Sequence, residues 1–374
     1  MKKQIKVLVA MSGGVDSSIA ALLMKRKGYD IIGVFMKCWS NTKNQVGECQ
    51  WREERRHALK IAAKLDIPLI TLDVEKEYKK FVVEEMYKDY KKGITPNPDV
   101  LCNEKIKFPF LLKKAKQLKA DFVVTGHYVQ TKNTKKGIEL LRGKDESKDQ
   151  SYFLYRLKQS ELKKLIFPIG EYTKTKIREM AEERNFQNHD KKGTVGICFI
   201  GKINLKDFLK QKVKPKKGKI LNPKGEIIGQ HDGIFYYTIG QRIGPRFDLD
   251  INKKNQEQTN QLSRWYVASK NTKKNELTIA PQNHDLLYRK QIKIKNLYLI
   301  SETKQELEKA KNVLARIRHV GELLPSKLSF NKKSKQFQIT LNVKDKRGIT
   351  GVSEGQAIVL YKGRKVLGGG TISF

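Results

Sequence analysis

A glycine-glycine turn between a short apolar run and an amphipathic segment constrains this chain more than any other feature. Ile5 to Ala10 has the length and composition of a buried strand, and it leads directly into Met11-Ser12-Gly13-Gly14-Val15-Asp16-Ser17-Ser18. We expect a helix to begin at Asp16 or Ser17. Glycines let backbone N–H groups approach an anion closely, and a helix N-terminus adds partial positive charge. The turn is therefore either an anion site or a tight corner that glycine permits.

The rest of the first half continues the alternation of strand and helix patterns. Short apolar runs of strand length are separated by amphipathic stretches long enough for helices. This rhythm predicts an α/β fold, a parallel sheet with helices on both faces. The expected strands are Ile31–Met36, Leu69–Asp73 and Ala120–Thr125, and the expected helices are Ser17–Lys27, Glu53–Leu65, Glu75–Tyr90, Gln159–Leu165 and Thr173–Asn185.

From about Leu205 the pattern changes to short β-type runs separated by turn signals such as Asn222-Pro223-Lys224-Gly225. A small β module followed by a second β-barrel or sandwich is predicted. The polar stretch from Asn252 to Ser263 is predicted to be a mobile loop. The expected β runs are Lys219–Leu221, Glu226–Ile228, Ile234–Thr238, Trp265–Ser269, Leu277–Ala280 and Gln336–Val343.

The chain has 77 Lys and Arg against 39 Asp and Glu, a formal net charge of +38 over 374 residues. Such an excess favours a polyanionic partner, because phosphate contacts release condensed counterions. The alternative is a general bias toward lysine on solvated faces, and charge alone leaves both open. No apolar run has the length of a membrane span, and the N-terminal segment lacks a signal-peptide cleavage pattern. A cytoplasmic protein without a membrane partner is expected.

The four cysteines are Cys38, Cys49, Cys102 and Cys198, and they include no Cys-x-x-Cys pair. A disulfide framework and a structural zinc site are therefore not expected. Each thiol is either inert packing or a nucleophile, and Cys38 and Cys49 are interpreted as bystanders.

Two of the thiols have chemically suggestive neighbours. Asp99 precedes Cys102 by three residues in the proline-stiffened segment Thr95 to Asn103, close to an expected helix that Pro109 should disturb. Cys198 lies between Gly196 and Gly201, near Lys191 and Lys192, in a segment that would be flexible and electropositive. Both thiols also fit the alternative of a small buried side chain, and the residues alone do not decide.

Ser12 to Ser18 resembles the pyrophosphatase-type loop of enzymes that cleave ATP between its α and β phosphates, and it lacks the spacing of a Walker A loop or a dinucleotide fingerprint. Further segments resemble the tRNA-specific 2-thiouridylases, in that family's order and over residues 5 to 374. These segments are Thr95–Lys107, Thr125–Tyr128, Leu141–Gly143, Lys148–Leu154, Gly196–Gly201, Gly355–Ala357 and Leu367–Gly370.

The resemblance implies an N-terminal adenine-nucleotide hydrolase-like (PP-loop ATPase) catalytic domain over residues 1–204, a small central β domain over 205–282 and a C-terminal tRNA-binding β-barrel over 283–374. It implies ATP-dependent 2-thiolation of the wobble uridine in tRNA. The C2 oxygen would be adenylated first and then replaced by sulfur from a cysteine persulfide. Mg²⁺ would accompany ATP, and no structural metal is expected. The implied partners are tRNAs of the Lys, Glu and Gln type and a cysteine desulfurase or sulfur-relay protein.

The same resemblance implies roles for individual residues. Asp99 would act as acid or base, Cys198 would carry the persulfide, and Cys102 would be its partner nucleophile, with a transient disulfide between the two thiols. The residues implied to hold ATP are Ala10, Met11, Ser12, Gly13, Gly14, Val15, Asp16, Ser17, Met36 and Gly126. The residues implied to contact the target base and the tRNA are Asn97, Pro98, Asp99, His127, Lys148, Asp149, Gln150, Ser151, Arg316, Ile317, Arg318 and Gln356.

The sequence departs from the family pattern in three places. Gly193-Thr194-Val195 replaces an acidic residue and a Ser or Thr, Pro245 to Leu262 is long and polar, and Ile317 stands where an aromatic residue is usual. These changes concern tRNA contacts and loop motion rather than ATP chemistry. The competing interpretations are a ligase with the same loop, such as a GMP or argininosuccinate synthetase, a sulfurtransferase that makes 4-thiouridine, and a basic RNA-binding module with a decayed loop. The pair of cysteines and the intact loop favour 2-thiolation.

Overall fold

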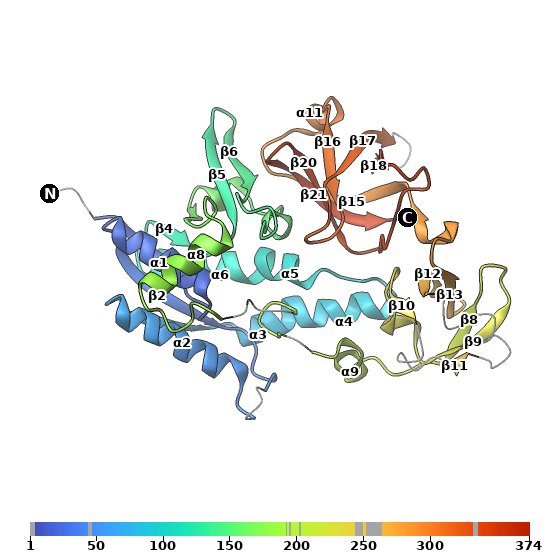
Figure 1. Ribbon diagram of the computed structural model, residues 1–374, viewed down its shortest axis with the longest axis horizontal. Coiled ribbons are helices and arrows are strands. Elements are labelled where there is room, and N and C mark those ends of the chain that lie inside the picture. Colours follow the sequence, from blue (N-terminus) through green and yellow to red (C-terminus); the bar gives the residue numbers. More distant parts are fainter. Residues whose placement is uncertain are drawn as a thin grey trace.

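The computed structural model describes residues 4–43, 47–191, 193, 196–201, 203–243, 250–251, 264–331 and 336–374. The predicted loop Asn252–Ser263 lies outside these residues, as do Lys192, Thr194 and Val195, and of Pro245–Leu262 only 250–251 are included. The described chain forms an α/β part, a small β module and a β-barrel, and a helical segment runs from the first to the second (Figure 1).

The α/β part is built on a parallel sheet of five strands in the order β3-β2-β1-β4-β7. Val7, Leu8 and Val9 on the central strand are fully buried because helices cover both faces of the sheet. This confirms the α/β prediction. The strands are β1 (Lys6–Ala10), β2 (Asp30–Lys37), β3 (Leu69–Asp73), β4 (Phe122–Val124) and β7 (Leu165–Ile166).

The helices of this part follow the predicted order with small shifts at their ends. The expected helix Gln159–Leu165 is wrong at its end, because the chain leaves the helix after Leu162 and Leu165 pairs with Val123 in the sheet. The helices are α1 (Val15–Arg26), α2 (Gln50–Lys64), α3 (Glu75–Tyr78), α4 (Glu84–Lys91), α5 (Pro98–Leu101), α6 (Phe108–Gln117), α7 (Gln159–Leu162), α8 (Lys174–Glu183) and α9 (Leu205–Lys210).

Two helical segments contain π-helical turns. Lys79–Val83 joins α3 to α4, and Cys102–Lys107 joins α5 to α6. In the second segment Pro109 occupies the first turn of α6. Proline has no N–H to donate, and its ring would clash with the carbonyl of Lys105 in a regular α-helix, so the wider turn relieves that conflict. The disturbance expected at Pro109 thus takes the form of a π-helical stretch that begins at Cys102.

The small β module contains a six-stranded sheet in the order β10-β12-β13-β8-β9-β11. The expected strand Ile234–Thr238 is wrong, because Ile234–Tyr236 forms a 3₁₀ turn. Adjacent residues of a strand point to opposite faces, whereas Tyr236 and Tyr237 are both buried here. The strands are β8 (Gly218–Leu221), β9 (Ile227–His231), β10 (Arg242–Ile243), β11 (Asp250–Ile251), β12 (Trp265–Asn271) and β13 (Glu276–Pro281).

The C-terminal part is a six-stranded antiparallel barrel, closed by the pairing of β15 with both β18 and β21. Its sheet continues into the hairpin β5–β6, which comes from the first half of the chain and pairs with β21 at Leu141 and Lys365. The barrel strands are β15 (Gln291–Leu299), β16 (Val313–Arg316), β17 (Leu324–Asn331), β18 (Gln336–Leu341), β20 (Ala357–Lys362) and β21 (Lys365–Ser373), and the hairpin strands are β5 (Val129–Thr134) and β6 (Gly137–Arg142).

The remaining short elements of the described chain are α11 (Lys304–Glu308), β14 (Tyr288–Arg289), β19 (Ile349–Thr350) and the 3₁₀ turns Ser151–Phe153 and Asp285–Leu287. Within the described ranges, none of the helices combines the length and the apolar character needed to span a bilayer.

Candidate active site

The glycine-rich turn connects β1 to the N-terminus of α1. Gly13 has a φ of +81°, and a Cβ there would lie 2.3 Å from the carbonyl oxygen of Glu54, so glycine is required. The backbone N–H of Ser12 donates to Ser17 Oγ at 3.1 Å, and the hydroxyls of Ser17 and Ser18 both donate to the carbonyl of Gly14. These bonds hold the turn against the first turn of the helix, whose free N–H groups suit a phosphate.

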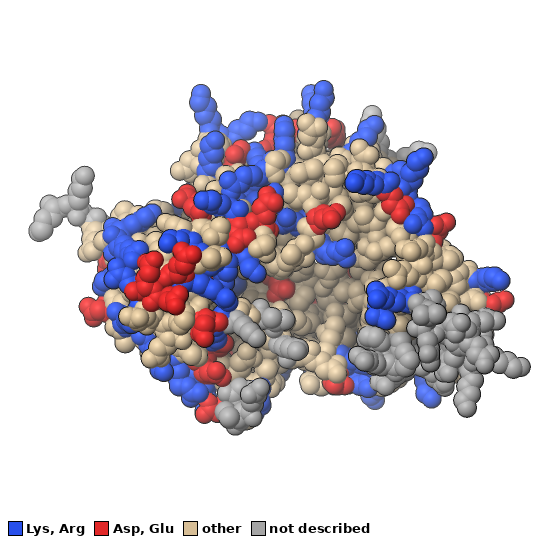
Figure 2. All heavy atoms as spheres, viewed as in Figure 1, with Lys and Arg blue, Asp and Glu red and all other residues tan. Residues whose placement is uncertain are grey.

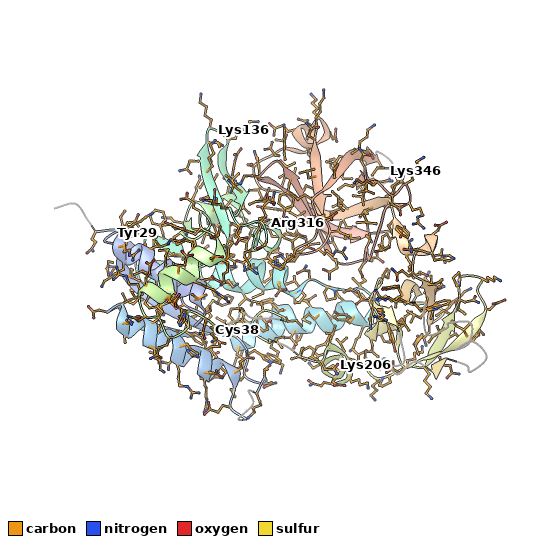
Figure 3. The ribbon with its side chains drawn as sticks, viewed as in Figure 1. Tyr29, Cys38, Lys136, Lys206, Arg316 and Lys346 are labelled. Atoms are coloured by element: carbon orange, nitrogen blue, oxygen red, sulfur yellow. The ribbon has the colours of Figure 1, made fainter. Side chains whose placement is uncertain are left out.

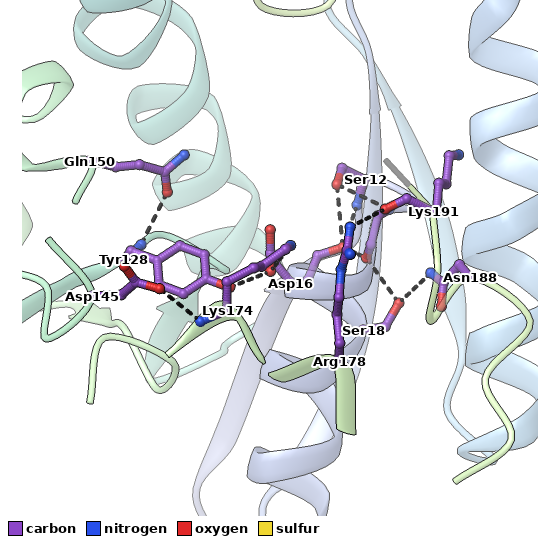
Figure 4. A network of polar contacts seen from close by, with 12 residues as sticks. Ser12, Asp16, Ser18, Tyr128, Asp145, Gln150, Lys174, Arg178, Asn188 and Lys191 are labelled. Carbon is purple, nitrogen blue, oxygen red and sulfur yellow. Dashed lines mark hydrogen bonds and ion pairs between the residues drawn. The ribbon is translucent and has the colours of Figure 1, made fainter. Parts of the chain in front are cut away.

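A polar network fixes the carboxylate of Asp16 (Figure 4). The ammonium of Lys174 lies 2.6 Å from Asp16 Oδ1, and the hydroxyl of Tyr128 donates to the same oxygen at 2.6 Å. Burial and the nearby charge of Asp16 raise the pKa of Tyr128, so its hydroxyl stays a donor. Asn188 donates to the Gly13 carbonyl and to Ser18 Oγ, both at 3.0 Å. Sequence reasoning assigned no role to Lys174 or Asn188, because neither belongs to a recognisable local pattern.

The other residues predicted to hold ATP gather at the same edge of the sheet, where the carboxyl ends of parallel strands meet. A Cβ on Gly126, just after β4, would lie 2.8 Å from the Asp16 carbonyl carbon and the Ser17 nitrogen, so this turn packs directly on the loop. Met11, Val15 and Met36 are buried around it, and Ala10 is partly buried.

The structure brings together three residues that the sequence analysis singled out. Cys102 Sγ lies 3.7 Å from Cys198 Sγ, although 96 positions separate the two residues. The backbone N–H of Cys198 donates to Asp99 Oδ1 at 2.9 Å, and Tyr78 donates its hydroxyl to the Cys198 carbonyl at 2.5 Å. The Cys198 segment is therefore anchored from two sides against α3 and α5.

The two thiols differ in acidity. Burial raises the pKa of Cys102, which is fully enclosed. The pKa of Cys198 is lowered, first by the hydrogen bond from the Cys102 thiol and then by Lys107, against the opposing effect of burial. Burial also raises the pKa of Asp99. Cys198 is thus the thiol that ionises first, with Cys102 as its S–H donor.

Asn97 and Gln356 lie where the barrel meets this loop. Asn97 Nδ2 donates to Gln356 Oε1 at 3.2 Å, and Gln356 Nε2 donates to the Pro96 carbonyl at 2.6 Å. Asn97 also caps α5 by accepting from the Val100 N–H. A cavity of about 240 Å³ borders this junction, and its lining includes Pro98 and Ile197, the immediate neighbours of Asp99 and Cys198.

Five residues predicted to contact the target base or tRNA are buried in this conformation, namely His127, Asp149, Ser151, Arg316 and Ile317. Asp149 accepts from Arg316 Nη1 at 2.7 Å, and Arg316 is 4% exposed. Figure 3 shows Arg316 at the junction between the barrel and the α/β part. Ile317 is buried beside it, whereas Lys148 and Arg318 are exposed and Gln150 accepts from the Tyr128 N–H. Contact of the buried residues with RNA stays a prediction.

The remaining candidate groups contribute little to this geometry. Cys38 is buried near the thiol pair, and burial raises its pKa. Cys49 precedes α2 as its N-terminal cap residue. In the part of the chain that the structure describes, no three or more His, Cys, Asp or Glu side chains gather in a way that could bind a metal ion.

Comparison with protein-family models finds three consecutive matches. The tRNA methyl transferase HUP domain matches residues 5–202, the tRNA methyl transferase PRC-barrel domain residues 206–281, and the aminomethyltransferase beta-barrel domain residues 289–372. These three matches together span nearly the whole chain.

Curated relatives align over almost their full length. The tRNA-specific 2-thiouridylase MnmA of Enterococcus faecalis is 39% identical over 369 residues, which covers 98% of this chain and 95% of that protein. MnmA of Bacillus subtilis is 38% identical over 376 residues, covering 98% and 94%. Among solved structures, a 4-thiouridine synthetase–RNA complex with bound ATP aligns at 18% identity with a TM-score of 0.36, over 56% of this chain and 50% of that one.

Proposed function

The chain belongs to the tRNA-specific 2-thiouridylase family, a family of sulfurtransferases that act on tRNA uridine, and we propose that it activates that uridine with ATP before transferring sulfur from Cys198. The observation that carries the proposal is the pair of thiols 3.7 Å apart beside Asp99. The methyltransferase wording of the family models differs from the names of the curated relatives. Two adjacent thiols of unequal acidity fit sulfur transfer.

The first step of the proposal uses the glycine turn. The C2 oxygen of uracil is a poor leaving group, so it attacks the α-phosphorus of ATP, pyrophosphate leaves, and C2 becomes bonded to AMP. Two features support nucleotide binding here: Gly13 and Gly126 let the backbone pack closely around the turn, and α1 presents its N-terminus. Asp16 is the carboxylate available to Mg²⁺ that enters with ATP, and the metal would neutralise phosphate charge. Lys174 and Tyr128 hold Asp16 in place.

The second step of the proposal uses the thiol pair. Cys198 first receives sulfur from a donor and becomes a persulfide, whose outer sulfur attacks C2 while AMP leaves. The Cys102 thiolate then attacks Cys198 Sγ, the Sγ–S bond breaks, and its electrons stay on the sulfur that is now bonded to the base. In the alternative order, Cys102 attacks first and releases sulfide, which then attacks C2. Both orders end in a Cys102–Cys198 disulfide that an external thiol must reduce.

The proposal includes the tRNA and the donor. Lys and Arg side chains cover much of the upper and left surface in Figure 2, with Asp and Glu among them, and such a surface favours the phosphate backbone. We assign residues 1–204 to catalysis, 205–282 to the central β domain and 283–374 to tRNA binding. The expected tRNAs are those of the Lys, Glu and Gln type, and the expected donor is a cysteine desulfurase or a relay protein.

Product analysis tests this function. The purified chain is incubated with ATP, Mg²⁺, an unmodified tRNA and a persulfide donor, and the nucleosides are then analysed by mass spectrometry. We expect 2-thiouridine at the wobble position together with AMP and pyrophosphate, and no thiolation by Cys198→Ser. Formation of 4-thiouridine, or release of ADP and phosphate, would contradict the proposal.

A further inference from the structure

The thiol pair is accompanied by a buried lysine to which the mechanism above assigns no role. Lys107 ends the π-helical stretch that Cys102 begins. In a regular α-helix, residues five apart point about 140° away from each other. A π-helical turn has i to i+5 hydrogen bonds, so Cys102 and Lys107 come to share one face. The π-helical turn therefore brings the Lys107 ammonium to the side of the helix that carries Cys102. In a regular α-helix the same lysine would point away from it.

The ammonium of Lys107 lies among groups that are each fixed by the fold. It is 3.4 Å from His127 Nε2 and 5.6 Å from the centre of the Phe199 ring, which directly follows Cys198. After the hydrogen bond from Cys102, the charge of Lys107 also lowers the pKa of Cys198. On this geometry we propose that Lys107, oriented by His127, is a positioning residue that keeps the sulfur of Cys198 anionic for transfer. This inference rests on the proposed function.

His127 orients the Lys107 ammonium and does not compete with it for the positive charge. Its Nδ1 lies 2.8 Å from Thr125 Oγ1, and its ring packs against both Phe108 and Phe167. Because the Lys107 ammonium can only donate, Nε2 must accept, which places the ring proton on Nδ1. Burial and then the charge of Lys107 lower the pKa of His127 well below its usual range. The ring is therefore neutral, and the positive charge stays on Lys107.

Among the described residues, the other ionisable groups that act on Cys198 or on its nearest neighbours are acids. They are Cys102 and Asp99 on the helical segment, Tyr78 on α3 and Cys38 at the end of β2. Burial raises the pKa of each of these four groups. When Cys198 loses its proton, Lys107 supplies the compensating positive charge inside the protein. A persulfide on Cys198 would carry its negative charge beside the same ammonium.

The test is the pH dependence of Cys198 alkylation. The full chain and Lys107→Met are treated with iodoacetamide over pH 5 to 10, and the Cys198 peptide is quantified by mass spectrometry. Methionine is close in volume and replaces a buried charge with an apolar side chain, so we expect an unchanged or higher melting temperature. Loss of the cation should move the inflection upward by about one unit, which lowers the alkylation rate near pH 7 about tenfold.

Lys105→Met is the matched control, because Lys105 lies on the same π-helical stretch with half of its side chain exposed and pairs with Glu104. Its alkylation profile should equal that of the unaltered chain. In thiolation assays Lys107→Met should form 2-thiouridine at least tenfold more slowly, while tRNA-dependent pyrophosphate release stays within about twofold. An unmoved inflection, or pyrophosphate release that falls as far as thiolation, would overturn the proposal. Alkylation needs neither ATP nor tRNA, so it tests the role of Lys107 even if the proposed thiolation activity is absent.

Discussion

Replacing Arg316 with methionine should loosen the junction between the barrel and the α/β part. Asp149 is enclosed and accepts from Arg316 Nη1 at 2.7 Å and from the backbone N–H groups of Gly143 and Ser151 at 3.1 Å. Arg142 Nε is more distant, at 3.4 Å. Without Arg316, Arg142 would be the remaining cation beside the Asp149 carboxylate, which would keep its hydrogen bonds from Gly143 and Ser151. Breaking a buried ion pair on one side costs about 3–5 kcal/mol, and Arg142 places this case at the lower end, about 3 kcal/mol.

Hydrogen exchange measures this loss locally. A cost of about 3 kcal/mol corresponds to at least a hundredfold faster exchange of the Gly143 and Ser151 amides if local opening governs their exchange. Peptides that cover residues 143–151 are compared by mass spectrometry for Arg316→Met, the unaltered chain and Arg318→Met. Arg318 is exposed two residues beyond Arg316, the last residue of β16, so its variant should exchange like the unaltered chain. Exchange of Arg316→Met within threefold of the unaltered chain would refute the assignment of Arg316 to this buried pair.

The remaining predictions concern the nucleotide turn, the surface charge and a second buried lysine. Gly126→Ala should abolish tRNA-dependent pyrophosphate release while tRNA still binds, because its Cβ would lie 2.8 Å from the backbone of Asp16 and Ser17. For tRNA, log K should fall linearly with log salt, and a flat plot would show that the charge of +38 is not used. Burial lowers the pKa of Lys270 from 10.5 to about 8. Between these pH values the unfolded chain holds a proton that the folded chain has lost. The free energy of unfolding, measured relative to Lys270→Met, should therefore rise with pH by roughly 3 kcal/mol. Denaturant titrations at several pH values can check this.

The local sequence pattern was sufficient to predict the fold class of the α/β part and the alternation of strands and helices along it. The central strands β1 and β2 are largely buried and therefore read as short apolar runs, and the partly buried edge segment Leu69–Asp73 forms β3 with the expected bounds. The Ser12 to Ser18 turn could also be interpreted from local sequence, because the residues that form it are consecutive. The β-rich second half was also recognised from its turn signals.

Features that depend on distant partners were not predictable. The hairpin β5–β6 is stabilised by pairing with β21 more than 200 positions later, and its local sequence does not show which sheet it joins. The burial of Arg316 was missed because its charge suggests an exposed contact, whereas Asp149 neutralises it inside the protein. The expected strand at Ile234–Thr238 failed because tertiary packing of Tyr236 and Tyr237 prevailed over β propensity.

The site itself was only partly predictable. Asp99, Cys102 and Cys198 were assigned through family resemblance, and their neighbours alone left the thiols undecided. Nothing in the spacing showed that two cysteines 96 positions apart would lie at 3.7 Å. Lys107 escaped attention because its position relative to Cys102 depends on a π-helical turn, which a period of 3.6 residues does not anticipate.

The central claim is that Cys102 and Cys198 act as a pair during sulfur transfer, and a single turnover tests it most directly. Persulfidated protein is mixed with tRNA and ATP without reductant, quenched with an alkylating agent and mapped by peptide mass spectrometry. We predict one equivalent of 2-thiouridine, one of AMP and a single disulfide-linked peptide pair that contains Cys102 and Cys198. Full activity of Cys102→Ser, or Cys198 joined to Cys38 or Cys49, would contradict the claim.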